Sequence, residues 1–116
     1  MQTIPVLLLD AGTGNLHSVF HTLRSLDAKV TISSDPQDLH RADRVILPGV
    51  GAFARFMQGL HKQALDQAIL QFIANGKPLL GICVGMQALF EYSLELGQHP
   101  GLGILKGIVQ RFTQTQ

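Results

Sequence analysis

Four short, apolar-rich runs spaced along the chain constrain its fold more than any other feature of the sequence. The runs cover residues 6–9, 30–32, 45–47 and 79–82. Between them, apolar residues recur every three or four positions, as they do along one face of a helix. Continuous apolar runs are typical of strands buried on both faces, and strands that alternate with helices indicate βαβ units. The pattern predicts a single α/β unit with a doubly wound, mainly parallel sheet.

The first half of the chain carries clear signals for where its helices begin. Asn15 can cap a first helix, and Asp35 followed by Pro36 is typical of an N-cap and first helical position, here of a short helix ending near residue 40. The inner face of the first helix is predicted to carry Leu16, Val19, Phe20, Leu23 and Leu26.

The second half is predicted to be helical from about residue 53, with a break at Gly59. An Asn-Gly pair at residues 75–76, with a proline at residue 78, indicates a helix end. The sequence then predicts a helix over residues 84–94 and a last strand over residues 108–112.

Composition excludes several classes of function. The net charge of +1 provides no general attraction to nucleic acid or to an anionic membrane surface. The longest uncharged apolar run, residues 79–90, contains two glycines and is far shorter than the ~20 residues that span a bilayer. The single cysteine cannot form an internal disulfide, which favours a cytoplasmic location, and the five scattered histidines show no zinc-ligand spacing. We therefore expect no metal site and no cofactor.

The strongest chemical signal is the sequence Gly-Ile-Cys-Val-Gly at residues 81–85, where a predicted strand gives way to a predicted helix. A nucleophile at such a corner needs small neighbours, because the turn is sharp. This position would expose the Cys83 thiol beside a helix N-terminus, which favours the thiolate. The backbone N–H of Val84 could then donate to an oxyanion. The alternative is a buried, structural cysteine between two packing glycines.

A second glycine-rich turn, Pro-Gly-Val-Gly at residues 48–51, also follows a predicted strand. Because parallel strands end at one edge of their sheet, this turn can lie beside Cys83. Its glycines would let a backbone N–H rotate toward an oxyanion or away from it. An ordinary turn is the alternative.

Two further motifs are weaker. Gly12-Thr13-Gly14 resembles the start of a dinucleotide-binding fingerprint, with Asp35 near the distance expected of the ribose-binding acid, but His17 occupies the third glycine position. A tight strand-to-helix turn is the better interpretation of these glycines, and a partner-facing loop is the next alternative. His17 and His21 lie one helical turn apart without further ligands, so a solvated helix face is the better interpretation. The sequence does not place any histidine beside Cys83.

Taken together, three segments resemble the class I (triad) glutamine amidotransferases. They are residues 10–19 (DAGTGNLHSV), 47–53 (LPGVGAF) and 77–87 (KPLLGICVGMQ), in that order. Within the class, they are most similar to the glutaminase subunits of imidazole glycerol phosphate synthase, and residues 101–103 and 109–112 fit the same group. The resemblance implies a flavodoxin-like fold of the class I amidotransferase type.

The resemblance also implies a role for particular residues. Cys83 would attack the side-chain amide of glutamine, form a thioester and release ammonia. Val50, Gly51 and Val84 would provide the oxyanion hole. The ammonia would pass to a (β/α)₈-barrel cyclase subunit in histidine biosynthesis, as part of a heterodimer. The residues that would hold glutamine are Gly49, Gln87 and Glu95, and the loop with Gly14 and Asn15 would face the cyclase.

The chain departs from the family pattern in two respects. Val84 stands where the family usually has leucine, which is a mild change because the backbone acts there. The family's catalytic His and Glu lie in a C-terminal His-Pro-Glu segment, and His99-Pro100-Gly101 does not match it. Residues 1–116 therefore resemble the N-terminal portion of a single amidotransferase domain, cut short at its C-terminal end. We expect little glutaminase turnover from this portion alone, and an uncovered sheet edge that favours association.

The sequence is also compatible with three other kinds of function. A different cysteine-elbow α/β hydrolase would need its own base near Cys83 and would have no reason to carry Gln87 together with the 48–51 turn. A non-catalytic module would keep the fold but not the base. A paralogous amidotransferase would deliver ammonia to another acceptor, such as a sugar.

Overall fold

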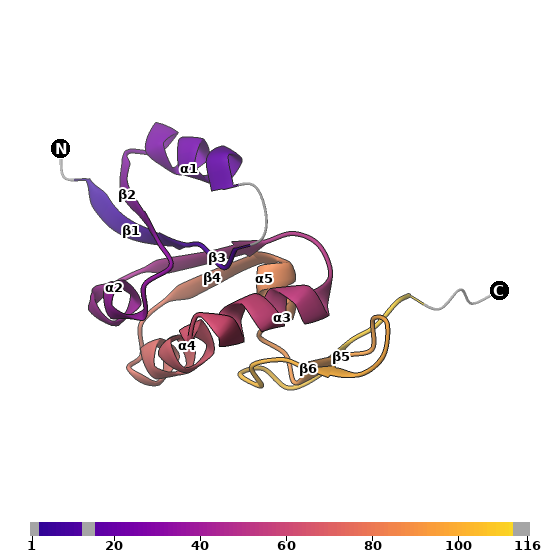
Figure 1. Cartoon of the computed structure of the whole chain (residues 1–116). Coiled ribbons are helices and arrows are strands. Elements are labelled where there is room, and N and C mark those ends of the chain that lie inside the picture. Colours follow the sequence, from indigo (N-terminus) through magenta and orange to yellow (C-terminus); the bar gives the residue numbers. More distant parts are fainter. Residues whose placement is uncertain (1–2, 13–15, 113–116) are drawn as a thin grey trace.

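The computed structural model describes residues 3–12 and 16–112 (Figure 1). A four-stranded sheet, in the order β2-β1-β3-β4, forms the centre, and every neighbouring pair in it is parallel. This confirms the predicted mainly parallel sheet. Its elements are β1 (Ile4–Leu9), α1 (Leu16–Ser25), β2 (Ala28–Ser33), α2 (Pro36–Arg41), β3 (Val45–Gly49), α3 (Phe53–Lys62), α4 (Leu65–Ala74), β4 (Leu79–Cys83) and α5 (Val84–Gln87).

Helices lie on both faces of the sheet, as a doubly wound fold requires. In Figure 1, α1 lies on one side and α2, α3 and α4 on the other. The main core is on the α3 and α4 side, where alternate residues of β1 and β3 meet the inner faces of these helices. Its fully buried members include Leu9, Leu47, Phe53, Phe56, Leu60 and Ile69.

The face beneath α1 is covered less completely. Ser18, Val19, Thr22 and Leu23 on α1 line a cleft of about 310 Å³ together with Ile46, Leu80 and Ile82. No residue of α1 is fully buried, and Leu26, predicted on its inner face, is 72% exposed because the helix ends at Ser25. In the described part of the chain β4 pairs with β3 alone, so its other edge is open. The expected association through this edge stays a prediction.

Gly59 does not break the second helical region as predicted. Helix α3 continues through it to Lys62, and the chain turns at Ala64, which has a left-handed backbone with φ of 58°. A Cβ atom on Gly59 would overlap the carbonyl oxygen of Ala11. The glycine therefore serves close packing of α3 against the end of β1.

The helix predicted over residues 84–94 is also wrong in its length. Helix α5 is a single turn, because the carbonyl groups that would continue it bind a later loop instead. Ala88 accepts a hydrogen bond from the N–H of Leu102 at 2.8 Å, and Leu89 accepts from the N–H of Ile104 at 2.9 Å. The predicted last strand is shorter as well: β7 is Ile108–Val109, in a small sheet with β5 (Tyr92–Ser93) and β6 (His99–Pro100).

A hydrogen-bonded pair, His61 and Asp66, closes the corner between α3 and α4. Nδ1 of His61 lies 2.8 Å from Oδ2 of Asp66. Burial raises the pKa of the Asp66 carboxyl, but the hydrogen bond to His61, the N–H of Gln67 and the attraction of His61 together lower that pKa below its usual value.

We expect this corner to lose stability in acid. A carboxyl whose pKa is lower in the folded than in the unfolded state contributes stability above the unfolded pKa of about 4, and this contribution disappears as the pH falls through the folded value. Asp66→Asn should therefore lower the free energy of unfolding at pH 7 by up to about 1 kcal/mol and have little effect near pH 2. Urea unfolding of both forms at several pH values measures this, and a pH-independent difference would contradict it.

Among the described residues, no helix combines the length and apolar character that crossing a membrane requires.

Candidate active site

Cys83 stands at the corner where β4 ends and α5 begins, with its side chain exposed. Its backbone has φ of 56° and ψ of −124°, which is unusual for a residue with a Cβ atom. Strained residues of this kind are concentrated at functional sites, and a nucleophile at a strand-to-helix corner is a known example. The structure therefore disagrees with the alternative of a buried, structural cysteine.

The two glycines beside Cys83 are required by close backbone contacts. A Cβ atom on Gly85 would overlap the carbonyl oxygen of Leu47, and one on Gly81 would lie 2.7 Å from the Cα of Met86. These contacts let α5 turn back directly against β3 and β4. Because α5 is only one turn long, the long-helix dipole expected to favour the thiolate is absent, although the unpaired N–H groups of a first turn remain.

The 48–51 turn lies at the same edge of the sheet as Cys83. Gly49 is the register partner of Cys83 in the β3–β4 pairing. After it, Val50 is 54% exposed and Gly51 has φ of 95°, and α3 begins at Phe53. We define residues 49–52 as the oxyanion loop, after its predicted role. The structure brings this loop and Cys83 together; the donor role of Val50, Gly51 and Val84 stays a prediction.

Two of the three residues predicted to hold glutamine, Gln87 and Glu95, follow Cys83 in the chain. Gln87 is half-buried at the end of α5 and lines a cleft of about 390 Å³ with Met86 and residues 108–112. Glu95 follows β5, and its Oε1 accepts a hydrogen bond from the backbone N–H of Phe53 at 3.0 Å. Glu95 is therefore in contact with the helix that follows the oxyanion loop. Sequence reasoning missed this bond, which spans 42 residues.

Four of the five histidines have contacts with groups other than Cys83. His61 binds Asp66, and Nε2 of His99 lies 3.0 Å from the carbonyl oxygen of Leu96. His17 and His21 stack on α1 with ring centroids 6.0 Å apart.

The fifth, His40, lies at the opposite end of the sheet. Its carbonyl accepts from Nζ of Lys77, just before β4, whereas Cys83 ends that five-residue strand, about 16 Å further along. A pairing of any described histidine with Cys83 is therefore not part of the contacts seen at this site.

The dinucleotide alternative finds no support in the described residues. The Asp10 carboxylate accepts from the N–H of Gly12 at 2.8 Å, which closes a local turn. Asp35, considered for the ribose, instead caps α2 as predicted, accepting from the N–H of Gln37 at 2.9 Å. Gly14 and Asn15 lie outside the described residues.

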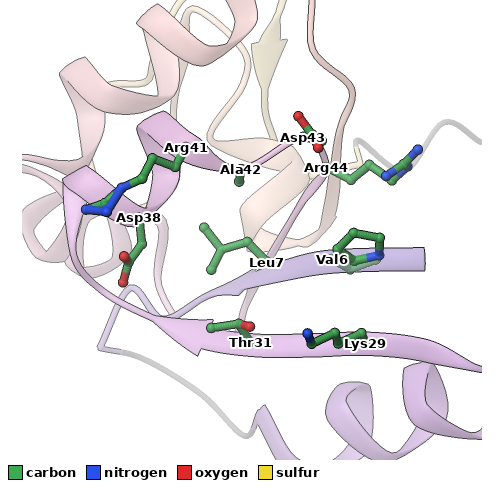
Figure 2. Close-up of a pocket in the computed structure, with 10 residues that line it drawn as sticks. Val6, Leu7, Lys29, Thr31, Asp38, Arg41, Ala42, Asp43 and Arg44 are labelled. Carbon is green, nitrogen blue, oxygen red and sulfur yellow. The ribbon is translucent and has the colours of Figure 1, made fainter. Parts of the chain in front are cut away.

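A cleft of about 320 Å³ lies near the amino ends of β1, β2 and β3 (Figure 2). Its basic side chains are Lys29, Arg41 and Arg44. In Figure 2, Arg41 and Arg44 point away from each other, so their charges do not converge on one position. Ligands of open α/β sheets bind at the carboxyl ends of the strands, which is where Cys83 lies. Among the described residues, no group of three or more His, Cys, Asp or Glu side chains could hold a metal ion.

Comparison with known proteins agrees with this geometry. The family model described as "Glutamine amidotransferase class-I" matches residues 7–104. The chain belongs to this family. The flavodoxin-like fold expected for the class I amidotransferases is supported by a solved glutamine amidotransferase structure, which superposes with a TM-score of 0.77 over 90% of this chain and 56% of that chain at 20% identity.

Curated relatives are more similar in sequence to this class I amidotransferase chain than that solved structure is. An imidazole glycerol phosphate synthase subunit HisH from a Cyanothece strain is 51% identical over 107 residues, which are 92% of this chain and 50% of the relative. The HisH subunit from Wolinella succinogenes is 47% identical over 109 residues, covering 94% of this chain and 53% of the relative. The chain thus spans about half the length of the curated relatives it matches.

Proposed function

We propose that this chain carries the nucleophile of a glutaminase that belongs to imidazole glycerol phosphate synthase. The observation that carries the proposal is the exposed Cys83, strained at the carboxyl end of β4 and directly beside the oxyanion loop. Membership of the class I amidotransferases gives this arrangement its reaction, and identities near 50% to HisH subunits support the assignment to the synthase.

In the proposed reaction, the Cys83 thiolate attacks the side-chain carbonyl carbon of glutamine. The carbon–nitrogen bond of the amide then breaks, and a proton delivered to the leaving nitrogen releases ammonia. Water hydrolyses the resulting thioester to glutamate and restores the thiol. The backbone N–H groups of Val50, Gly51 and Val84 would stabilise the oxyanion of both steps.

Glutamine binding is proposed to use residues on both sides of Cys83. Gly49 would line the site from β3, Gln87 lies one helical turn after the nucleophile, and Glu95 lies beside the start of α3. A carboxylate such as Glu95 suits the ammonium group of an amino-acid substrate.

The proton transfers need a base. We propose that residues 1–116 act as the N-terminal portion of one amidotransferase domain, since the chain spans about half the length of the HisH relatives and His99-Pro100-Gly101 does not match the family's His-Pro-Glu segment. Gly14 and Asn15 are proposed to face a (β/α)₈-barrel cyclase, which would consume the ammonia.

Covalent labelling of Cys83 tests this proposal. The probe is diazo-oxo-norleucine, a glutamine analogue that alkylates a nucleophilic thiol with loss of nitrogen gas, and iodoacetamide measures general thiol reactivity. We expect selective labelling of Cys83, detected by mass spectrometry and suppressed by excess glutamine, because the site would recognise the glutamine backbone. Cys83→Ser should abolish the labelling.

Equal and slow labelling by both reagents, with no protection by glutamine, would contradict the proposed glutamine site in this chain. Glutamate and asparagine serve as matched competitors: glutamate keeps the side-chain length of glutamine but ends in a carboxylate, and asparagine keeps the amide on a side chain one methylene shorter. Protection by glutamine alone would place the specificity at a side-chain amide held at the reach of glutamine.

A further inference from the structure

We propose that Glu95 is a positioning residue, which sets the conformation of the oxyanion loop by capping helix α3 from a distant part of the chain. Its meaning for catalysis rests on the proposed glutaminase function. The capping bond itself is a separate structural claim, tested separately below.

Helix α3 begins without a local cap. Its N-cap residue, Ala52, has an extended backbone and a side chain that cannot accept a hydrogen bond. The first N–H groups of a helix have no partner within the helix, so they need one from elsewhere. Oε1 of Glu95 supplies it, accepting from the N–H of Phe53 at 3.0 Å. A carboxylate at this end is also favoured by the helix dipole.

The backbone at Glu95 is held in place by hydrogen bonds to neighbouring residues. The N–H of Glu95 donates to Oγ of Ser93 at 3.0 Å, and Ser93 is completely buried. Ser93 pairs with His99 and with Val109 in the small sheet, and the N–H of Leu94 donates to the carbonyl of Val109 at 2.9 Å. The small sheet therefore fixes where Glu95 can reach.

The bond matters because the oxyanion loop is short. Its first residue, Gly49, is held in β3 beside Cys83, and its last residue, Ala52, is followed by the capped N–H of Phe53. Between these anchors lie only Val50 and Gly51, with an exposed side chain at Val50 and open space around Gly51. The two anchors therefore determine the directions of the loop N–H groups, and Glu95 forms one of them.

This role is distinct from substrate binding, although one side chain can serve both. A carboxylate accepts hydrogen bonds on two oxygens, so a bond from Oε1 to Phe53 leaves acceptor capacity for a ligand. Reach and charge separate the two roles. Glu95→Gln keeps an acceptor of the same length without the charge, whereas Glu95→Asp keeps the charge and shortens the side chain by one methylene.

The experiment measures two quantities on the 116-residue chain. Amide hydrogen exchange of Phe53, with the amide chemical shifts of Val50 and Gly51, reports the cap and the loop by NMR. The ratio of Cys83 labelling rates with diazo-oxo-norleucine and iodoacetamide reports the catalytic arrangement. Glu91→Asp is the matched control, because Glu91 makes a similar bond to the N–H of Gly107 at 2.8 Å, within the same region but away from α3.

We expect Glu95→Asp to accelerate Phe53 exchange by about tenfold or more, as loss of a charge-assisted hydrogen bond implies, to shift the Val50 and Gly51 signals, and to lower the labelling ratio. Glu95→Gln should retain the Phe53 protection and the Val50 and Gly51 signals, while its labelling ratio falls because the carboxylate proposed to bind the ammonium group of glutamine is lost. Glu91→Asp should leave Phe53, Val50, Gly51 and the labelling ratio unchanged.

Unchanged Phe53 exchange in Glu95→Asp would overturn the cap, whatever the protein's activity. Val50 and Gly51 signals that shift as far in Glu95→Gln as in Glu95→Asp, with Phe53 still protected, would show that the cap does not set the loop and would overturn the positioning role. If the unmodified chain shows no selective labelling, the proposed function fails. The Phe53, Val50 and Gly51 signals then still decide whether Glu95 fixes the loop.

Discussion

Replacing Gly85 with alanine is expected to destabilise this chain strongly. The new Cβ atom would overlap the carbonyl oxygen of Leu47, which belongs to the central strand β3 and cannot withdraw without moving the sheet. Overpacking against fixed atoms costs about 1–3 kcal/mol or more, and this contact is with backbone, so we expect at least ~3 kcal/mol. That is a large fraction of a typical 5–15 kcal/mol stability. Circular dichroism during thermal and urea unfolding measures the loss.

Gly76→Ala is the control for this substitution. Gly76 has φ of 79°, so alanine is strained there, but there are no atoms within 4 Å of its Cβ position. Its cost should be limited to the left-handed backbone, about 1–2 kcal/mol. Equal destabilisation by the two substitutions would show that the contact between Gly85 and Leu47 is not what makes the corner intolerant.

The second large effect is expected for Phe56→Ala, at the centre of the packing beneath the active site. Phe56 is completely buried, and its ring lies directly under Gly49, close to the side chain of Val84. Removing it leaves a cavity between α3, the oxyanion loop and α5. Truncation of a buried phenylalanine costs about 3–5 kcal/mol. The substitution should therefore lower both the unfolding midpoint in urea and the selectivity of Cys83 labelling.

Phe112→Ala provides the matched comparison, because Phe112 is fully exposed. The same truncation there should change the free energy of unfolding by less than about 0.5 kcal/mol. Similar losses at the two positions would contradict the placement of Phe56 in the core.

The strands and helix starts could be predicted because they depend on local signals. Strand β4, for example, is apolar and bounded by a proline and the cysteine corner, and Asp35 and Pro36 define the start of α2 within a few residues. The position of Cys83 beside the oxyanion loop follows from the same rules, since parallel strands end at one edge.

What could not be predicted depends on contacts between distant segments. The length of α5 is set by Leu102 and Ile104, which bind carbonyl groups that an isolated helix would use itself. The role of Gly59 depends on the approach of Ala11, and the cap of α3 comes from Glu95 instead of a local residue. Local propensity is a weak guide at such positions, because tertiary contacts override it. The residue that would act as base in the proposed reaction also could not be predicted, because the sequence does not place any histidine beside Cys83.

The strand order also determines how long the apolar residues of β1 stay uncovered during synthesis on the ribosome. β1 is made before both of its neighbours in the sheet, β2 and β3, so its second edge stays open until residue 45 has been added. At about 5–20 residues per second, Leu8 and Leu9, both completely buried in the finished fold, are without their full surroundings for seconds. While it waits for β3, β1 is thus exposed to aggregation, and a chaperone that binds short apolar strands would be most useful there.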